Sequence, residues 1–114
     1  LTDGAWKFSD MTTDSEDETI QGLVFLSKVL MTNATIEFQE GGDYLITFAD
    51  ELQQDPESGT WSLVGDDQLI LTEDNQGVPS TANIEVLTKS ELKFIETYVS
   101  GQQTSYNVTT SWKR

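Results

Sequence analysis

Carboxylates are the most abundant ionisable groups in this sequence that could do chemistry. The chain has 20 Asp and Glu residues against 6 Lys and Arg residues, and it contains no His and no Cys. The lack of His and Cys excludes thiol nucleophiles, Ser-His-Asp triads, disulfides and zinc sites built on these residues. The chemistry that remains is calcium binding by oxygen ligands and hydrolysis of glycosides by paired carboxyl groups.

Calcium binding would use the acidic clusters at residues 14–18, 66–67 and 73–75. None of them has the spacing of an EF-hand loop, in which acidic first, third and fifth positions lead to a glycine at the sixth. The first cluster also precedes an expected helix, whose N-terminus favours negative charge. We therefore expect surface charge at these clusters, and neither a metal ion nor a cofactor.

Glycoside hydrolysis needs two carboxyl groups on either side of a sugar, one of them with a pKa raised by its surroundings. The alternation of apolar residues described below places no Asp or Glu on an inward-facing position. The sequence therefore predicts no catalytic residue and no enzyme activity.

The elements that must position these groups are mainly β-strands, because apolar and polar residues alternate along most of the chain. A period of two puts every second side chain on one face of a strand. Eight segments show this pattern, with the apolar pairs Trp6 and Phe8, Ile36 and Phe38, Tyr44 and Ile46, Trp61 and Leu63, Leu69 and Leu71, Ile84 and Val86, Leu92 and Phe94, and Tyr106 and Val108.

Turn signals separate the expected strands. The glycines in residues 40–43 indicate a tight hairpin, and such short links favour antiparallel neighbours in a closed barrel or a sandwich. Residues 55–59 and 74–79 each contain a proline and are expected to form longer loops.

One segment departs from the alternation. From Ser15 to Met31 the apolar residues recur at helical spacing, and residues 15–18 have the pattern of a capping box with Ser15 as the N-cap. The alternative is a buried strand over residues 23–30, since Gly22 weakens a helix by about 1 kcal/mol and Val and Phe favour sheets. We expect a helix over residues 16–31 between the first two strands.

Length and composition bound the remaining possibilities. A chain of 114 residues fits a single domain over residues 1–114. Its formal net charge of −14 would repel a phosphate backbone, so nucleic acid is not an expected partner. No apolar stretch approaches the ~20 residues of a membrane-spanning helix. We expect a folded domain without a transmembrane segment, in the form of a monomer.

Several motifs follow one another along nearly the whole chain. In order they are Gly4-Ala5-Trp6, the hairpin 36–48 with Gly-Asp-Tyr at its turn, the segments 59–63, 67–72 and 84–94, and Trp112-Lys113-Arg114. This series resembles the small lipocalin-like domains common in exported proteins of Bacteroidetes. The resemblance implies an all-β fold, an eight-stranded antiparallel up-and-down barrel of the lipocalin or calycin type, and export to the periplasm or cell surface, often as a lipoprotein.

The resemblance also assigns a structural pair. In lipocalins the tryptophan of the first motif closes one end of the barrel beneath a basic side chain from near the C-terminus. Trp6 and Arg114 match these two roles. A guanidinium group over an indole ring contributes about 0.5 to 2 kcal/mol. We expect this pair to provide barrel closure.

The barrel interior is the expected ligand site. Eight strands enclose a space just wide enough to be filled by side chains or to hold one small ligand, so core packing and ligand binding are both open for the inward-facing residues. The candidate ligand-binding residues are Phe38, Tyr44, Ile46, Trp61, Leu92, Phe94 and Tyr106.

The sequence is therefore compatible with two alternative functions. The first is non-enzymatic binding of a small apolar or amphipathic molecule in the barrel, with neutral or cationic amphipaths preferred to fatty acids because no strand lysine points inward. The alternative is an interaction or inhibitor module whose acidic face docks a basic protein, since residues 1–57 carry 13 of the 20 acidic residues. High salt would weaken the second kind of binding and spare the first.

Overall fold

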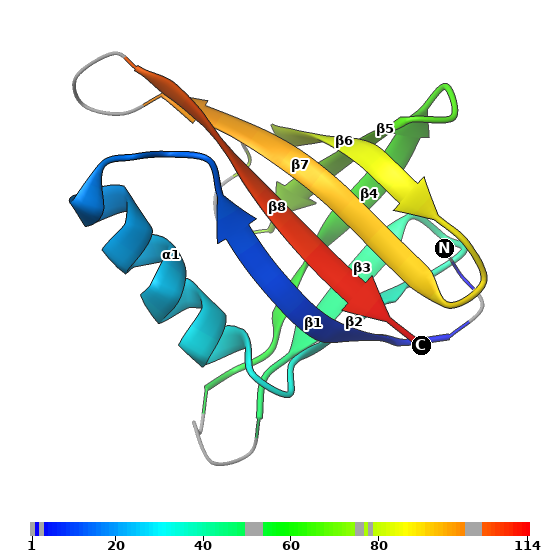
Figure 1. Cartoon of the computed structure of the whole chain (residues 1–114). Helices are drawn as coiled ribbons and strands as arrows, with labels where there is room; N and C mark the ends of the chain where they lie inside the picture. Colours follow the sequence, from blue (N-terminus) through cyan, green and yellow to red (C-terminus); the bar gives the residue numbers. More distant parts are fainter. Residues whose placement is uncertain (1, 3, 50–53, 75–76, 78, 100–103) are drawn as a thin grey trace.

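The strands of this protein form one closed barrel (Figure 1). The computed structural model describes residues 2, 4–49, 54–74, 77, 79–99 and 104–114. The elements within this part of the chain are β1 (Trp6–Thr13), α1 (Glu18–Met31), β2 (Thr35–Phe38), β3 (Asp43–Thr47), β4 (Glu57–Val64), β5 (Gln68–Glu73), β6 (Pro79–Leu87), β7 (Glu91–Val99) and β8 (Ser105–Lys113). Each strand pairs antiparallel with the next, and β8 pairs with β1. The predicted eight-stranded up-and-down barrel is confirmed.

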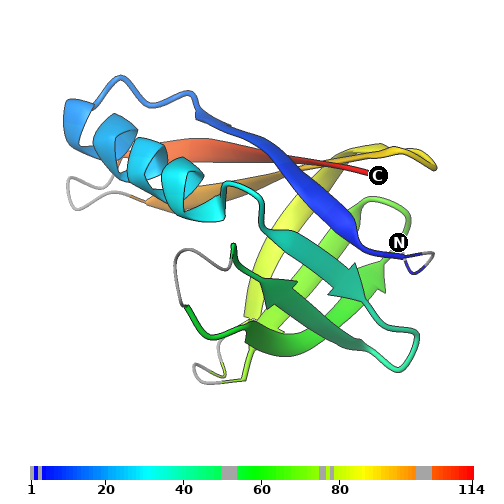
Figure 2. The ribbon, with the colours of Figure 1, turned by 90° about the horizontal axis from the view of Figure 1, so that it is seen from below.

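The two ends of the barrel differ in what lies there (Figures 1 and 2). The chain termini and the turns that join β2 to β3, β4 to β5 and β6 to β7 lie at one end, which we call the closed end. Gly42 and Gly65 have φ angles of 94° and 64° in two of these turns, a conformation that glycine adopts without strain. Helix α1 lies at the opposite, open end, together with the C-terminal ends of β1, β3, β5 and β7.

Helix α1 confirms the predicted helix, but it begins later than its sequence pattern suggests. Asp17 is the N-cap, and its Oδ1 accepts a hydrogen bond of 2.8 Å from the backbone N–H of Thr19. The Oγ of Ser15 instead accepts from the backbone N–H of Asp17 at 3.2 Å. The expectation of Ser15 as the N-cap is wrong. Ser15 and Asp17 each bind the backbone N–H two residues ahead, and the helix starts at the second of them.

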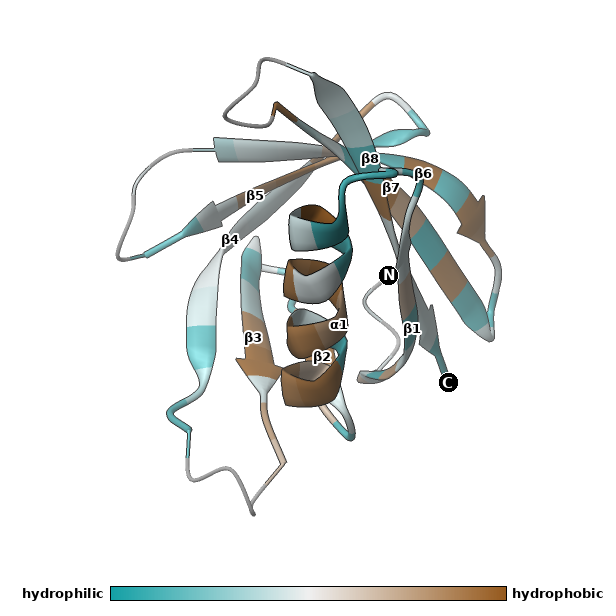
Figure 3. Cartoon of the chain, turned by 60° about the vertical axis from the view of Figure 1, so that its left-hand side comes forward, coloured by the Kyte–Doolittle hydropathy of each residue, from teal (hydrophilic) through white to brown (hydrophobic). Residues whose placement is uncertain are grey.

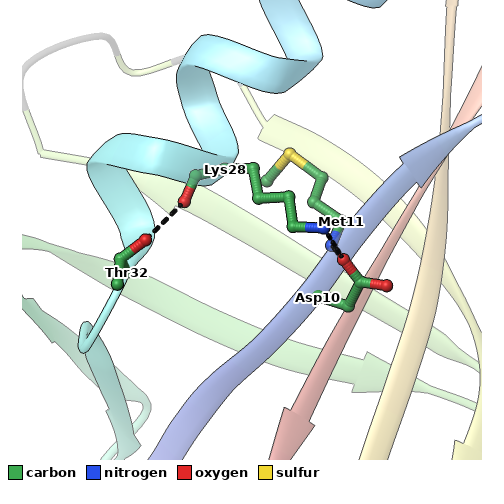
Figure 4. A network of polar contacts seen from close by, with 4 residues as sticks. All are labelled: Asp10, Met11, Lys28 and Thr32. Carbon is green, nitrogen blue, oxygen red and sulfur yellow. Dashed lines mark hydrogen bonds and ion pairs between the residues drawn. The ribbon is translucent and has the colours of Figure 1, made fainter.

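Few contacts attach α1 to the barrel. Lys28 Nζ lies 2.6 Å from Asp10 Oδ1 on β1, and the same carboxylate accepts from the Met11 backbone N–H at 2.8 Å (Figure 4). The hydrogen bonds from Lys28 and then Met11 hold the pKa of Asp10 below its usual value. Ile20 is the buried residue of this helix. The helix therefore rests on β1 along a narrow contact.

Much of the surface of α1 is apolar and exposed (Figure 3). Its large side chains are between 46% and 65% exposed, and they are Leu23, Phe25, Leu26, Val29 and Leu30. Among the described residues, no helix combines the length and apolar character needed to cross a membrane.

The core fills the closed half of the barrel. Trp6, Leu69 and Leu92 are fully buried there and belong to one cluster with six further residues: Ile36, Phe38, Tyr44, Ala82, Phe94 and Trp112. A β-bulge between Phe8 and Asp10 shifts the alternation of β1 by one residue, so Met11 and not Asp10 faces the interior.

Candidate functional site

The open half of the barrel contains a cavity of about 660 Å³, which we call the barrel cavity. Its floor includes Ile36, Phe94 and Trp112, which are at most 4% exposed. Pro79 and Tyr98 also line it and are exposed, so the cavity reaches solvent at the open end. Small-molecule sites have volumes of roughly 300 to 1,000 Å³.

Three carboxylates line the upper part of the barrel cavity: Glu57 on β4, Glu73 on β5 and Glu96 on β7. We call them the acidic rim. All three are half-buried. The expectation that no Asp or Glu faces the interior is therefore wrong. The reason is strand length, since β4 already begins at Glu57, within the segment 55–59 that the sequence suggests to be a loop.

Glu57 and Glu73 lie next to each other across β4 and β5. Glu57 opens β4, and Glu73 pairs with Gly59 two residues further along it. Burial, the negative charge of Glu73 and a hydrogen bond between the two carboxyl groups all raise the pKa of Glu57. In this partly buried space the negative charge of Glu73 disfavours ionisation of Glu57.

Glu96 is held by hydroxyl donors. Its Oε2 accepts a hydrogen bond of 2.7 Å from Ser80 Oγ on β6 and one of 2.9 Å from the Tyr98 hydroxyl on β7. Partial burial and the neighbouring carboxylate raise the pKa of Tyr98, so this hydroxyl remains a donor at neutral pH. The carboxylate is thus fixed in position by uncharged groups.

Tyr44 joins the floor of the cavity to the rim. It pairs with Gly59, and a Cβ atom at position 59 would lie 2.7 Å from Cε1 of the tyrosine ring, so the missing side chain leaves the space that this ring occupies. Burial, followed by the charges of Glu57 and Glu73, raises the pKa of Tyr44 to about 12. The hydroxyl is therefore neutral at physiological pH.

Trp112 provides an unused donor. Its side chain is 2% exposed and lines the barrel cavity, and its ring meets Phe8 edge to face at 5.6 Å between centroids. The indole N–H has no hydrogen-bond partner, and it is the only buried side-chain nitrogen or oxygen of the described residues in this state. A buried donor without an acceptor costs about 1 to 3 kcal/mol.

The structure distributes the candidate ligand-binding residues over the molecule. Tyr44, Ile46 and Phe94 line the barrel cavity. Phe38 and Leu92 are 1% and 0% exposed within the core and are not among the residues that line it.

Trp61 and Tyr106 lie outside the barrel cavity. Trp61 packs edge to face on Phe38 at 5.6 Å, and its indole N–H donates to the Gln39 backbone oxygen at 2.9 Å. Tyr106 stacks on Tyr98 at 5.7 Å and lines a smaller pocket of about 210 Å³ beneath α1.

The closed end has the contact expected of Trp6 and Arg114. The guanidinium carbon lies 3.7 Å from the centroid of the Trp6 ring, which is 0% exposed. The backbone N–H of Arg114 also donates to the Ser90 oxygen at 3.0 Å, which ties the end of the chain to the turn between β6 and β7. The expected contact between Trp6 and Arg114 is therefore present.

The acidic rim and Trp112 are the site residues that sequence reasoning missed. A signal existed for two of the three carboxylates, because Glu73 and Glu96 continue the inward-facing series that Leu69 and Leu71, and Leu92 and Phe94, begin. The described residues contain no group of three or more acidic side chains arranged to hold a metal ion.

The sequence was also compared with known proteins. The family model of the lipocalin-like domain matches residues 2–94, which include every strand from β1 to β6 and the start of β7. No curated protein matches the chain. Fold, barrel cavity and family match agree, and the chain belongs to the lipocalin-like domain family.

Proposed function

We propose that this domain is a non-enzymatic binding protein that holds a small apolar or amphipathic molecule in the barrel cavity. The observation that carries the proposal is the cavity itself, about 660 Å³ of space above a floor of buried apolar side chains. Burial of apolar ligand surface against this floor would contribute roughly 25 cal/mol per Å².

The position of the carboxylates supports binding over hydrolysis. Glycosidases place a sugar between two carboxyl groups that are at least about 5 Å apart. Glu57 and Glu73 lie side by side on the neighbouring strands β4 and β5, so they are on one wall of the cavity and not on either side of a bound sugar. The remaining rim residue, Glu96, accepts hydrogen bonds from Ser80 and Tyr98 through Oε2.

The proposal includes export to the periplasm or cell surface as a lipoprotein of a Bacteroidetes organism. Its support is the resemblance of the motif Gly4-Ala5-Trp6 and the later hairpins to exported members of the family. We further propose a monomer, since a net charge of −14 opposes self-association.

The test is a titration with N-phenyl-1-naphthylamine, a neutral probe that fluoresces in apolar surroundings. We expect saturable binding by the wild type. Ile46→Trp, which places a larger ring in the cavity lining, should weaken it by at least about tenfold. Leu45→Trp is the matched control, because this residue is on the same strand and does not line the cavity.

Two results would contradict the proposal: no saturable binding by the wild type, or equal losses in the two variants. The acidic surface would then be the site to test, with basic proteins at low and high salt.

A further inference from the structure

We propose that the barrel cavity selects amphipaths whose polar end is an ammonium group, and that Glu57, Glu73 and Glu96 receive this group. The inference rests on the proposed function, since it names the ligand class of the same cavity. The observation that supports it is the charge of the cavity lining. The ionisable groups of the lining are the three rim carboxylates and the hydroxyls of Tyr44 and Tyr98.

No cation of the protein neutralises the acidic rim. All six basic residues lie in the described part of the chain, and none of them lines the cavity. Lys28 is paired with Asp10 outside the barrel, and Arg114 lies over Trp6 at the closed end. Ionised rim carboxylates therefore repel one another in a partly desolvated space, and a bound organic cation would remove that cost.

The rest of the lining suits an apolar body. The floor of the same cavity consists of the buried side chains of Ile36, Phe94 and Trp112, which offer an apolar surface below the carboxylates of the rim. Burial of apolar ligand surface against this floor stabilises the complex. We therefore infer a ligand with an ammonium head and an apolar body.

The arrangement also gives binding a pH dependence. The titratable groups that line the barrel cavity with Glu57 are Glu73 on β5, Tyr44 on β3, and Glu96 and Tyr98 on β7; Asp55 and Asp74 line a neighbouring pocket with it. The pKa of Glu57 is raised by burial and by Glu73, and an ammonium group favours the ionised carboxylate. Affinity for a quaternary ammonium ion, which cannot titrate, should therefore rise with pH through this raised pKa and level off above it.

The experiment compares three ligands of equal chain length: decyltrimethylammonium, decan-1-ol and decanoate. Each displaces the neutral probe at neutral pH, below its micelle concentration. We expect decyltrimethylammonium to bind at least about tenfold more tightly than either of the others, as one charge-assisted contact in a partly buried site would give.

Charge-matched variants separate the rim from the net charge. Glu57→Gln combined with Glu73→Gln should remove most of the preference for the ammonium ligand. Glu37→Gln combined with Glu85→Gln removes the same charge from exposed positions on β2 and β6 and should leave the preference unchanged. Glu96→Gln is a second rim variant in case the first does not fold, and thermal unfolding with retained binding of the neutral probe checks the fold.

Three outcomes would overturn the inference while leaving the proposed function intact. Decanoate could bind as tightly as the ammonium ligand, or the two double variants could lose the preference equally. Displacement of the ammonium ligand by millimolar calcium would instead identify the rim as a metal site. Loss of saturable probe binding in the wild type itself would contradict the proposed function as well.

Discussion

The two ends of this barrel use the same alternation of inward-facing residues for opposite purposes. At the closed end the interior positions hold Trp6, Leu69 and Leu92, all 0% exposed, with Arg114 packed over the first of them. At the open end the same strands turn Glu73 and Glu96 inward, and the space between them is a cavity. The packed core and the cavity are thus segregated along the barrel axis, and the open end holds charged groups that a packed core would exclude.

The largest effect should follow from truncation of the closed end. Trp6→Ala removes a fully buried aromatic side chain and should lower the free energy of unfolding by ~3 to 5 kcal/mol in denaturant titrations. A loss below about 1 kcal/mol, the size of an average substitution, would show that the closed end does not carry the stability that we assign to it.

The next effect lies at the floor of the open half. Gly59→Ala would place a Cβ atom 2.7 Å from Cε1 of Tyr44 and would also press on the backbone oxygen of Thr72. We expect a loss of ~1 to 3 kcal/mol in the free energy of unfolding, as for other overpacked sites. The displaced tyrosine ring should also weaken binding of the neutral probe. Unchanged stability and binding would mean that this ring does not need the space above Gly59.

A smaller effect measures the contact between Arg114 and Trp6. A double-mutant cycle of Arg114→Ala and Trp6→Ala should give a coupling energy of about 0.5 to 2 kcal/mol, the range for a cation over the face of an indole ring. Additive losses would show that the contact at 3.7 Å contributes nothing to closure.

The smallest effect should come from the exposed side of α1. Leu26 is 60% exposed, so Leu26→Ala should change the free energy of unfolding by no more than about 0.5 kcal/mol. The same denaturant titration measures it beside Trp6→Ala. If Leu26→Ala lowered the free energy of unfolding as much as Trp6→Ala does, this face of the helix would be covered in solution.

The closed end could be predicted from the sequence because its residues obey simple rules. Apolar pairs such as Leu69 and Leu71, or Leu92 and Phe94, mark the strands by their period of two, and the resemblance of Trp6 and Arg114 to the lipocalin closure gave their contact. The helix was predicted for the same reason, since its apolar residues recur at helical spacing.

The open end could not be predicted by these rules. A carboxylate on an inward-facing position breaks the apolar alternation, so Glu57 was assigned to a loop and β7 was followed no further than Phe94. The bulge after Phe8 changes which residues of β1 face inward, and no single residue signals it. Ser15 and Asp17 are both residue types that cap helices, and only the backbone hydrogen bonds show that Asp17 is the N-cap.

The most direct test of the segregation between the two ends uses the three tryptophans as reporters. Their indole N–H signals can be followed by ¹H–¹⁵N NMR while decyltrimethylammonium is added to the wild-type protein. Trp112 lines the barrel cavity, whereas Trp6 lies under Arg114 and the Trp61 N–H donates to the Gln39 backbone oxygen. We predict a saturable shift of the Trp112 signal with the Trp6 and Trp61 signals unchanged. A shift of the Trp6 signal with a constant Trp112 signal would contradict the account.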